Sequence, residues 1–122
     1  MNDNGFQTDA EYGKLLISSQ GQYGFRPYEL LVSSIVGCSG GTLRKVLEKM
    51  RLPFEDIKVS AEVDRNPEEA NRIEKIHLTF TIPSRDISKE KLEKAMAVTV
   101  KNCAMIQSVK DSMDITESLV TV

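Results

Sequence analysis

Two cysteines, Cys38 and Cys103, are the side chains of this chain best suited to covalent chemistry. A thiolate is a strong nucleophile, and two thiols that meet can form a disulfide. Free cysteine is also among the most buried residue types, and it often serves only packing. Each cysteine lies in an apolar stretch with a helical pattern, so both should face a core where they could meet. The residues alone leave two interpretations open, a pair of structural thiols or a reactive pair.

A serine nucleophile is a second candidate, because "GCSGG" at residues 37–41 formally matches the pattern G-x-S-x-G. That motif needs a strand before the serine, whereas a helical pattern runs on both sides of Ser39. The only available base, His77, lies on the polar face of a predicted strand with no obvious carboxylate partner. We therefore interpret Ser39, Gly40 and Gly41 as residues that allow close packing against a neighbouring backbone.

The composition excludes several other kinds of site. Two separated cysteines and one histidine cannot supply the four closely spaced ligands of structural zinc, so we expect no metal and no other cofactor. The net charge of −2, with both signs interspersed, gives no basic surface for nucleic acid or an anionic membrane. The N-terminal segment lacks the pattern of a signal peptide, and the longest apolar run is shorter than a membrane span. We expect a cytoplasmic protein without nucleic-acid or membrane partners.

The elements that must position the cysteines form one predicted domain of 122 residues. Alternating apolar and polar residues predict strands, spacings of three and four residues predict helices, and Ser88 is a suitable N-cap. The expected elements are N-terminal strands within 1–26, a long central helix over 27–51, a β-hairpin over 55–83, helices over 88–112 and a final strand over 114–122. This order indicates an α+β fold with helices packed on antiparallel sheet.

The first half of the predicted helix has no charged face after Glu29. A helix of that kind must be buried nearly all round. Its apolar residues are Leu30, Leu31, Val32, Ile35 and Val36. One small domain can hardly enclose a helix of about 37 Å. We therefore expect a second copy of the chain to cover it.

A reactive thiol needs support for its charged form. A helix break after Asn102 would place Cys103 at a helix N-terminus, where the helix dipole favours a thiolate. Positive charge near Cys38 is scarce, because Arg44 lies roughly 240° from it around the helix. Arg26, just outside the start of the helix, is the better candidate.

The order of motifs resembles the OsmC/Ohr family: "RPYELLVSSIVGCSGGTLRKVL", then "IKVSAEV" and "IHLTFTI", then "KNCAMIQSVKDSMDI" and a last strand. The resemblance covers most of the chain after residue 25. It implies antiparallel sheets and a long central helix in an intertwined homodimer. It also implies a thiol peroxidase that reduces organic hydroperoxides in oxidative-stress defence. Cys38 would attack the peroxide, Cys103 would form a disulfide with the resulting sulfenic acid, and a dithiol donor would reduce that disulfide.

The chain departs from the family pattern in the residues that would activate Cys38. Family peroxidases have a glutamate directly after the proline, whereas this chain has Tyr28 there and Glu29 one position later. The family's activating arginine comes from an N-terminal strand, whereas the first arginine here is Arg26, and Ala104 stands where relatives often have proline. We keep Arg26, Tyr28 and Glu29 as candidate activating or orienting residues. Two alternatives stay open, a dimer that binds a small ligand without turnover and a thiol redox sensor.

Overall fold

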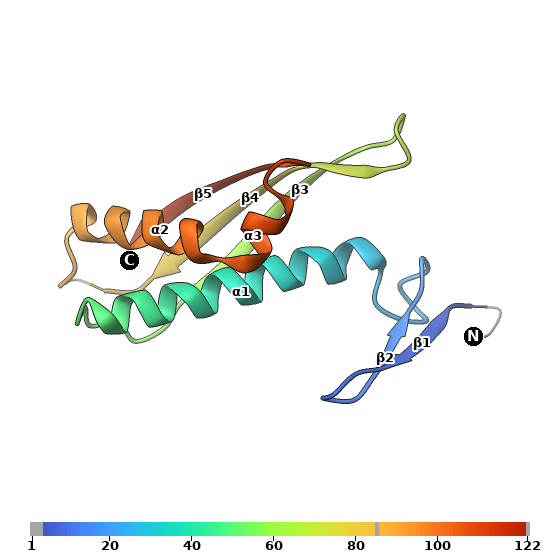
Figure 1. Ribbon diagram of the computed structural model, residues 1–122, viewed down its shortest axis with the longest axis horizontal. Coiled ribbons are helices and arrows are strands. Elements are labelled where there is room, and N and C mark those ends of the chain that lie inside the picture. The colour runs from blue at the N-terminus through green and yellow to red at the C-terminus, as the bar shows by residue number, and fades with distance from the viewer. Residues whose placement is uncertain (1–3, 85, 122) are drawn as a thin grey trace. The chain divides into compact units, whose positions relative to one another are not determined.

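The computed structural model describes residues 4–84 and 86–121. Its elements follow one another as β1 (Phe6–Asp9), β2 (Lys14–Ile17), α1 (Pro27–Lys49), β3 (Lys58–Asn66), β4 (Arg72–Ile82), α2 (Lys89–Asn102), α3 (Ala104–Val109) and β5 (Asp114–Thr121) (Figure 1). The expected α+β class is therefore confirmed. The chain forms two compact units, and the boundary between Ser33 and Ser34 lies inside α1.

The first unit contains an antiparallel hairpin of β1 and β2, in register from Phe6 opposite Ile17 to Asp9 opposite Lys14. The chain then returns along β2, where the Phe25 amide donates to the Leu16 carbonyl at 2.9 Å. A two-stranded hairpin with nothing packed on it is only marginally stable. Several of its large apolar side chains are exposed in the described chain, namely Phe6, Tyr12, Leu16 and Phe25.

The second unit is built on a three-stranded sheet in the order β3-β4-β5. β3 and β4 are antiparallel, from Lys58 opposite Thr81 to Asn66 opposite Arg72. The turn that joins them contains Ala70 and Asn71 with φ of 58° and 57°. This left-handed conformation is easier for asparagine than for most residues. The expected hairpin therefore forms from two strands with period-two patterning.

The last strand differs from the expectation of antiparallel sheet, because β5 runs parallel to β4. Its register extends from Lys75 opposite Asp114 to Ile82 opposite Thr121. The reason is the connection: α2 and α3 bring the chain back to the end of the sheet where β4 began, as Figure 1 shows. A crossover of this length is the connection that parallel strands require.

The core lies on one face of this sheet. The residues of β4 that face the helices are buried, while the residues between them are only half-buried. Together with α1 and α2 they supply the fully or almost fully buried side chains Ile35, Leu43, Leu47, Ile76, Leu78, Phe80, Ile82, Leu92 and Ala95. One-sided cover follows from strict alternation in the sequence.

Helix α1 begins at Pro27 and ends at Lys49, two residues before the expected end. The amides of Arg51 and Leu52 donate to the carbonyls of Glu48 and Leu47, both at 3.0 Å, and Arg51 has a φ of 57°. These two bonds and the left-handed residue form a Schellman motif, which terminates a helix.

Burial along the first half of α1 is less complete than expected. Val32 and Ile35 are buried, whereas Leu31 is 38% exposed. The other two apolar side chains, Leu30 and Val36, are half-buried. By length and composition alone α1 could cross a membrane, a test that core helices of soluble proteins also pass. The described chain therefore leaves apolar surface on α1 that a single copy does not cover.

Candidate functional site

The structure brings the two cysteines together. Cys38 lies on α1 and is half-buried, whereas Cys103 is fully buried between α2 and α3. The Cys103 thiol donates a hydrogen bond to the sulfur of Cys38. Both residues belong to the second unit, so their contact lies within one compact body. The two thiols are therefore neighbours in the folded chain.

Cys103 owes its position to a break in the helix. α2 ends at Asn102, whose side-chain amide donates to the Val98 carbonyl at 2.8 Å. Cys103 itself is extended, with φ of −79° and ψ of 110°, and it is the N-cap of α3. The expected break after Asn102 is therefore present, and Cys103 itself occupies the capping position. The first amides of α3 have no carbonyl partners within their own helix, so they can donate to other acceptors.

These amides lower the pKa of the Cys38 thiol. The Met105 amide has the largest effect, and the Cys103 thiol, the Ala104 amide and the Thr42 hydroxyl add to it. The two amides and the Cys103 thiol donate hydrogen bonds that favour the charged form of the sulfur. Partial burial acts in the opposite direction but does not cancel them. Cys38 is therefore the thiol that ionises more easily.

The pKa of Cys103 moves the other way. Burial raises it, and the neighbouring Cys38 raises it further, while the Ile106 and Met105 amides oppose this in part. The amides at the start of α3 favour a thiolate at Cys103, as expected, but burial outweighs them and the pKa is raised. Two amides at the same helix start, those of Met105 and Ala104, lower the pKa of Cys38. The pair consists of a protonated donor, Cys103, and an acceptor sulfur, Cys38.

Thr42 is a site residue that the sequence interpretation did not include. Its hydroxyl donates to the Cys38 carbonyl at 2.8 Å, and it also supports the Cys38 sulfur. The available signal was its spacing, because a residue four positions after Cys38 lies on the same side of a helix.

Ser39 and His77 lie in different surroundings. The Ser39 hydroxyl is buried and donates to the Val36 carbonyl at 3.2 Å. The two ring nitrogens of His77 are hydrogen-bonded to Thr116 Oγ1 at 2.6 Å and Ser118 Oγ at 2.7 Å. Both hydroxyl partners of His77 come from β5, and the His77 side chain is half-buried. The structure gives no support to a serine nucleophile at Ser39.

The glycines near Cys38 were expected to allow close packing against a neighbouring backbone, and the structure agrees only in part. A Cβ atom on Gly40 would lie 3.6 Å from a methyl group of Val59, an ordinary contact with β3. Among the described residues, and apart from the adjoining backbone of α1 itself, a Cβ atom on Gly37 or Gly41 would meet no atom within 4 Å. These two glycines leave a small-residue surface on α1 that this copy of the chain does not fill.

The three other candidate residues belong to the first unit, so the geometry of Cys38 is described without them. The Arg26 amide donates to Glu29 Oε1 at 3.3 Å, and both side chains are exposed. Tyr28 is half-buried. Their part in activating Cys38 stays a prediction.

The class of protein follows from comparison with known families. The family model described as "OsmC-like protein" matches residues 19–118, and the chain therefore belongs to this family. The resemblance seen in the sequence is thereby confirmed.

Individual relatives agree with this assignment. The organic hydroperoxide resistance protein OhrB of Bacillus subtilis (strain 168) is 22% identical over 96 residues, which cover 79% of this chain and 70% of OhrB. The crystal structure of OhrB covers 98% of this chain and 93% of its own, with 17% identity and a TM-score of 0.68. The OsmC-like protein of Mycoplasma pneumoniae covers 100% and 92%, with 14% identity and a TM-score of 0.89. These structures confirm the OsmC-like fold.

Proposed function

We propose that this chain is a cysteine-dependent peroxidase that reduces organic hydroperoxides in defence against oxidative stress. The observation that carries the proposal is the hydrogen-bonded pair of Cys38 and Cys103, whose pKa values move in opposite directions. A peroxidase needs one thiol that ionises and a second thiol close by that stays protonated until it is used. The name of OhrB, an organic hydroperoxide resistance protein, supports the substrate class.

The reaction balances with the two thiols and a reductant. The Cys38 thiolate attacks the terminal oxygen of the hydroperoxide, so that an S–O bond forms and the O–O bond breaks. The alcohol leaves after taking up one proton, and Cys38 is now a sulfenic acid. The Cys103 sulfur then displaces water from Cys38 and forms a disulfide. An external dithiol reduces the disulfide to two thiols and is itself oxidised to a disulfide.

The local geometry favours the first two steps. The Met105 and Ala104 amides stabilise the anionic sulfur before it attacks. Half-burial of Cys38 leaves the sulfur reachable, while full burial of Cys103 protects that thiol from direct oxidation. Immediate capture of the sulfenic acid by Cys103 limits further oxidation, which is irreversible in most proteins.

A homodimer is the second part of the proposal. The exposed apolar side chains of the hairpin and of Leu31 need cover, and a second copy of the chain would supply it. Gly37 and Gly41 would allow a neighbouring helix to approach α1 closely. We place this homodimer in the cytoplasm, where dithiol reductants keep thiols reduced.

Peroxide consumption by the purified, reduced protein tests the proposal. With cumene hydroperoxide and dithiothreitol, the wild-type protein should consume many equivalents of peroxide. Cys38→Ser should lose this activity by about a hundredfold or more, because attack by a thiolate is removed. Cys103→Ser should accumulate a Cys38 sulfenic acid that dimedone traps. Each variant replaces one cysteine sulfur by oxygen, so each serves as the control for the other.

The outcomes separate the alternatives. One equivalent of disulfide without turnover would indicate a redox sensor. Two thiols that stay reduced in excess hydroperoxide would contradict the peroxidase and favour a dimer that binds a ligand without chemistry. Equal activity of the wild-type protein and Cys38→Ser would remove Cys38 from the mechanism.

A further inference from the structure

Glu117 occupies a position on β5 where an apolar residue would be expected. The strand alternates, and Ile115, Glu117 and Leu119 share the register of the buried residues Ile76, Leu78 and Phe80 on β4. A carboxyl group therefore lies on the helix-covered side of the sheet. A charged group in such a place is rare unless it has a partner or a function.

The Glu117 carboxyl has no hydrogen-bond partner for one of its oxygens. Oε2 is buried, and within residues 4–84 and 86–121 it has no hydrogen bond. Burial raises the pKa of the group, and the attraction of His77 opposes this only in part. An unpaired buried oxygen costs the full loss of its hydration, so it marks a place where a ligand can supply the missing donor.

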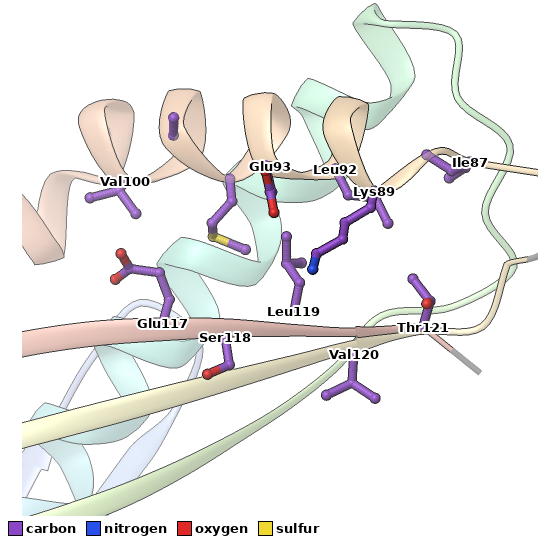
Figure 2. A pocket seen from close by; sticks show the side chains of 12 residues that line it. Ile87, Lys89, Leu92, Glu93, Val100, Glu117, Ser118, Leu119, Val120 and Thr121 are labelled. Atoms are coloured by element: carbon purple, nitrogen blue, oxygen red, sulfur yellow. The ribbon is translucent and has the colours of Figure 1, made fainter.

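The carboxyl borders a cavity between α2 and β5 with a volume of about 790 Å³. Figure 2 shows Glu117 at one end, near Val100, and Lys89 reaching into the space from α2. Most of the wall is apolar and comes from Ile87, Leu92, Met96, Val100 and Leu119. Cavities of roughly 300–1,000 Å³ with an apolar wall and a few polar groups are typical of small-molecule sites.

The charged groups of the cavity favour a cation. Its ionisable side chains are Lys89, Glu93 and Glu117, so two carboxylates face one ammonium group. The site therefore complements a ligand with one positive charge. The distance from Glu117 to Thr121 along β5 is about 13 Å, which gives room for an extended chain of about eight carbons.

We propose that this cavity binds a small amphipathic cation, a primary amine on an apolar chain, with the ammonium group paired to Glu117. The ammonium group pairs with the Glu117 carboxylate at the end of the cavity, and the apolar chain lies along the wall formed by α2 and β5. The cavity contains neither cysteine, so binding here is separate from thiol chemistry.

Titration of the reduced full-length protein with octylamine, octan-1-ol and octanoate tests the site. Calorimetry should show that octylamine binds at least about tenfold more tightly than octan-1-ol of the same chain length, and that octanoate binds most weakly. Glu117→Gln should weaken octylamine about tenfold or more and leave octan-1-ol within about twofold. Asp114→Asn removes an exposed carboxylate from the same strand and should change neither affinity.

Two-dimensional amide spectra place the ligand. Octylamine should shift the signals of Val100 and Leu119 in the wild-type protein, with smaller shifts at equal ligand concentration in Glu117→Gln. Equal affinity for octylamine and octanoate would overturn the proposal, and so would unchanged octylamine binding by Glu117→Gln. Absence of saturable binding to the folded protein would overturn it too and would indicate that a second copy closes this cavity. None of these results depends on peroxide turnover, which is measured separately.

Discussion

Cys38 and Cys103 are neighbouring residues of the same type, and their surroundings move their pKa values in opposite directions. The Met105 amide, the Cys103 thiol and the Ala104 amide donate to the sulfur of Cys38 and lower its pKa. Cys103 has lost its water and lies beside another sulfur. Backbone amides thus lower the pKa of Cys38, and no charged side chain is among the causes of that shift.

Removal of one of these amides should make Cys38 less reactive. Ala104→Pro deletes an amide hydrogen at the first residue of α3, a position that proline tolerates. Cys103 is extended, as a residue before proline should be. The pKa of Cys38 should rise, and its alkylation by iodoacetamide at neutral pH should slow about twofold to tenfold. Ala104→Ser keeps the amide and is the matched control, so equal slowing in both variants would contradict this explanation.

The buried carboxyl of Glu117 should make stability depend on pH. Its pKa is raised in the folded state above the ordinary 4.5, so the folded protein holds this proton more tightly than the unfolded chain. Ionisation of Glu117 therefore lowers the free energy of unfolding as pH rises from about 4.5 through the pKa of the folded state. The loss is complete once the pH is above the pKa values of the folded and the unfolded state. Below 4.5 the cost vanishes.

Glu117→Gln should accordingly raise the melting temperature near pH 7.5, in the absence of amine, and the gain should shrink toward pH 4. Thermal unfolding of the wild-type protein, of Glu117→Gln and of the exposed control Asp114→Asn at both pH values measures this. A gain of the same size at both pH values, or a loss of stability near pH 7.5, would show that the Glu117 charge is not the cause.

Helices and strands were largely predictable at the scale of elements, because their signals are local. Strict alternation predicted β3 and β4, and the side chain of Ser88 caps α2 as expected. The direction of β5 was not predictable in this way, because it depends on which edge of the sheet the chain joins after α2 and α3. The end of α1 was also missed, since Arg51 adopts a left-handed conformation without being glycine.

The candidate site was predictable to a smaller extent. Residue type identified Cys38 and Cys103, and the apolar helical pattern indicated that they could meet. The amides of Ala104 and Met105 carry no signal in residue type, because every residue except proline has an amide. The place of Glu117 against α2 could not be read from the last strand alone, since alternation does not say which face is covered.

The exposed surface of α1 around Gly41 would lie close to a second helix in the proposed dimer. Gly41 faces open space in the single chain, so Gly41→Leu should fit the isolated fold and add about 1 kcal/mol of helix propensity. In a dimer the leucine would prevent close approach of a second helix. Light scattering should therefore show a shift from dimer toward monomer, with helix content retained by circular dichroism.

Lys45→Ala is the control for Gly41→Leu, because it changes an exposed residue of α1 without adding bulk. A Gly41→Leu protein that remains dimeric at micromolar concentration would show that α1 does not pack near Gly41 in the dimer.

The chain forms two units, and all but one of the buried apolar side chains of the described residues belong to the second. The first unit contains a small hairpin with exposed apolar residues and the first turns of α1, and a two-stranded hairpin rarely persists alone. A second copy of the chain is the partner that a pure protein always has available. The dimer and the thiol pair are independent in this account, because Cys38 and Cys103 meet within one unit of one chain.

The wild-type protein should therefore have twice the mass of one chain by light scattering, whether reduced or oxidised. After treatment with hydroperoxide, denaturing electrophoresis without reductant should still show single chains, because the disulfide forms within each chain. A ladder of covalent dimers would place the bond between copies and contradict the geometry of the pair.

Peptide mapping of the wild-type protein after one equivalent of organic hydroperoxide tests the central claim most directly. The reduced protein is oxidised, free thiols are blocked, and the digest is examined by mass spectrometry without reductant. The account predicts one linked pair of peptides that joins Cys38 to Cys103, with a loss of two hydrogens from the intact chain. Blocked thiols at both positions, or oxygen added to Cys38 without a link to Cys103, would contradict it.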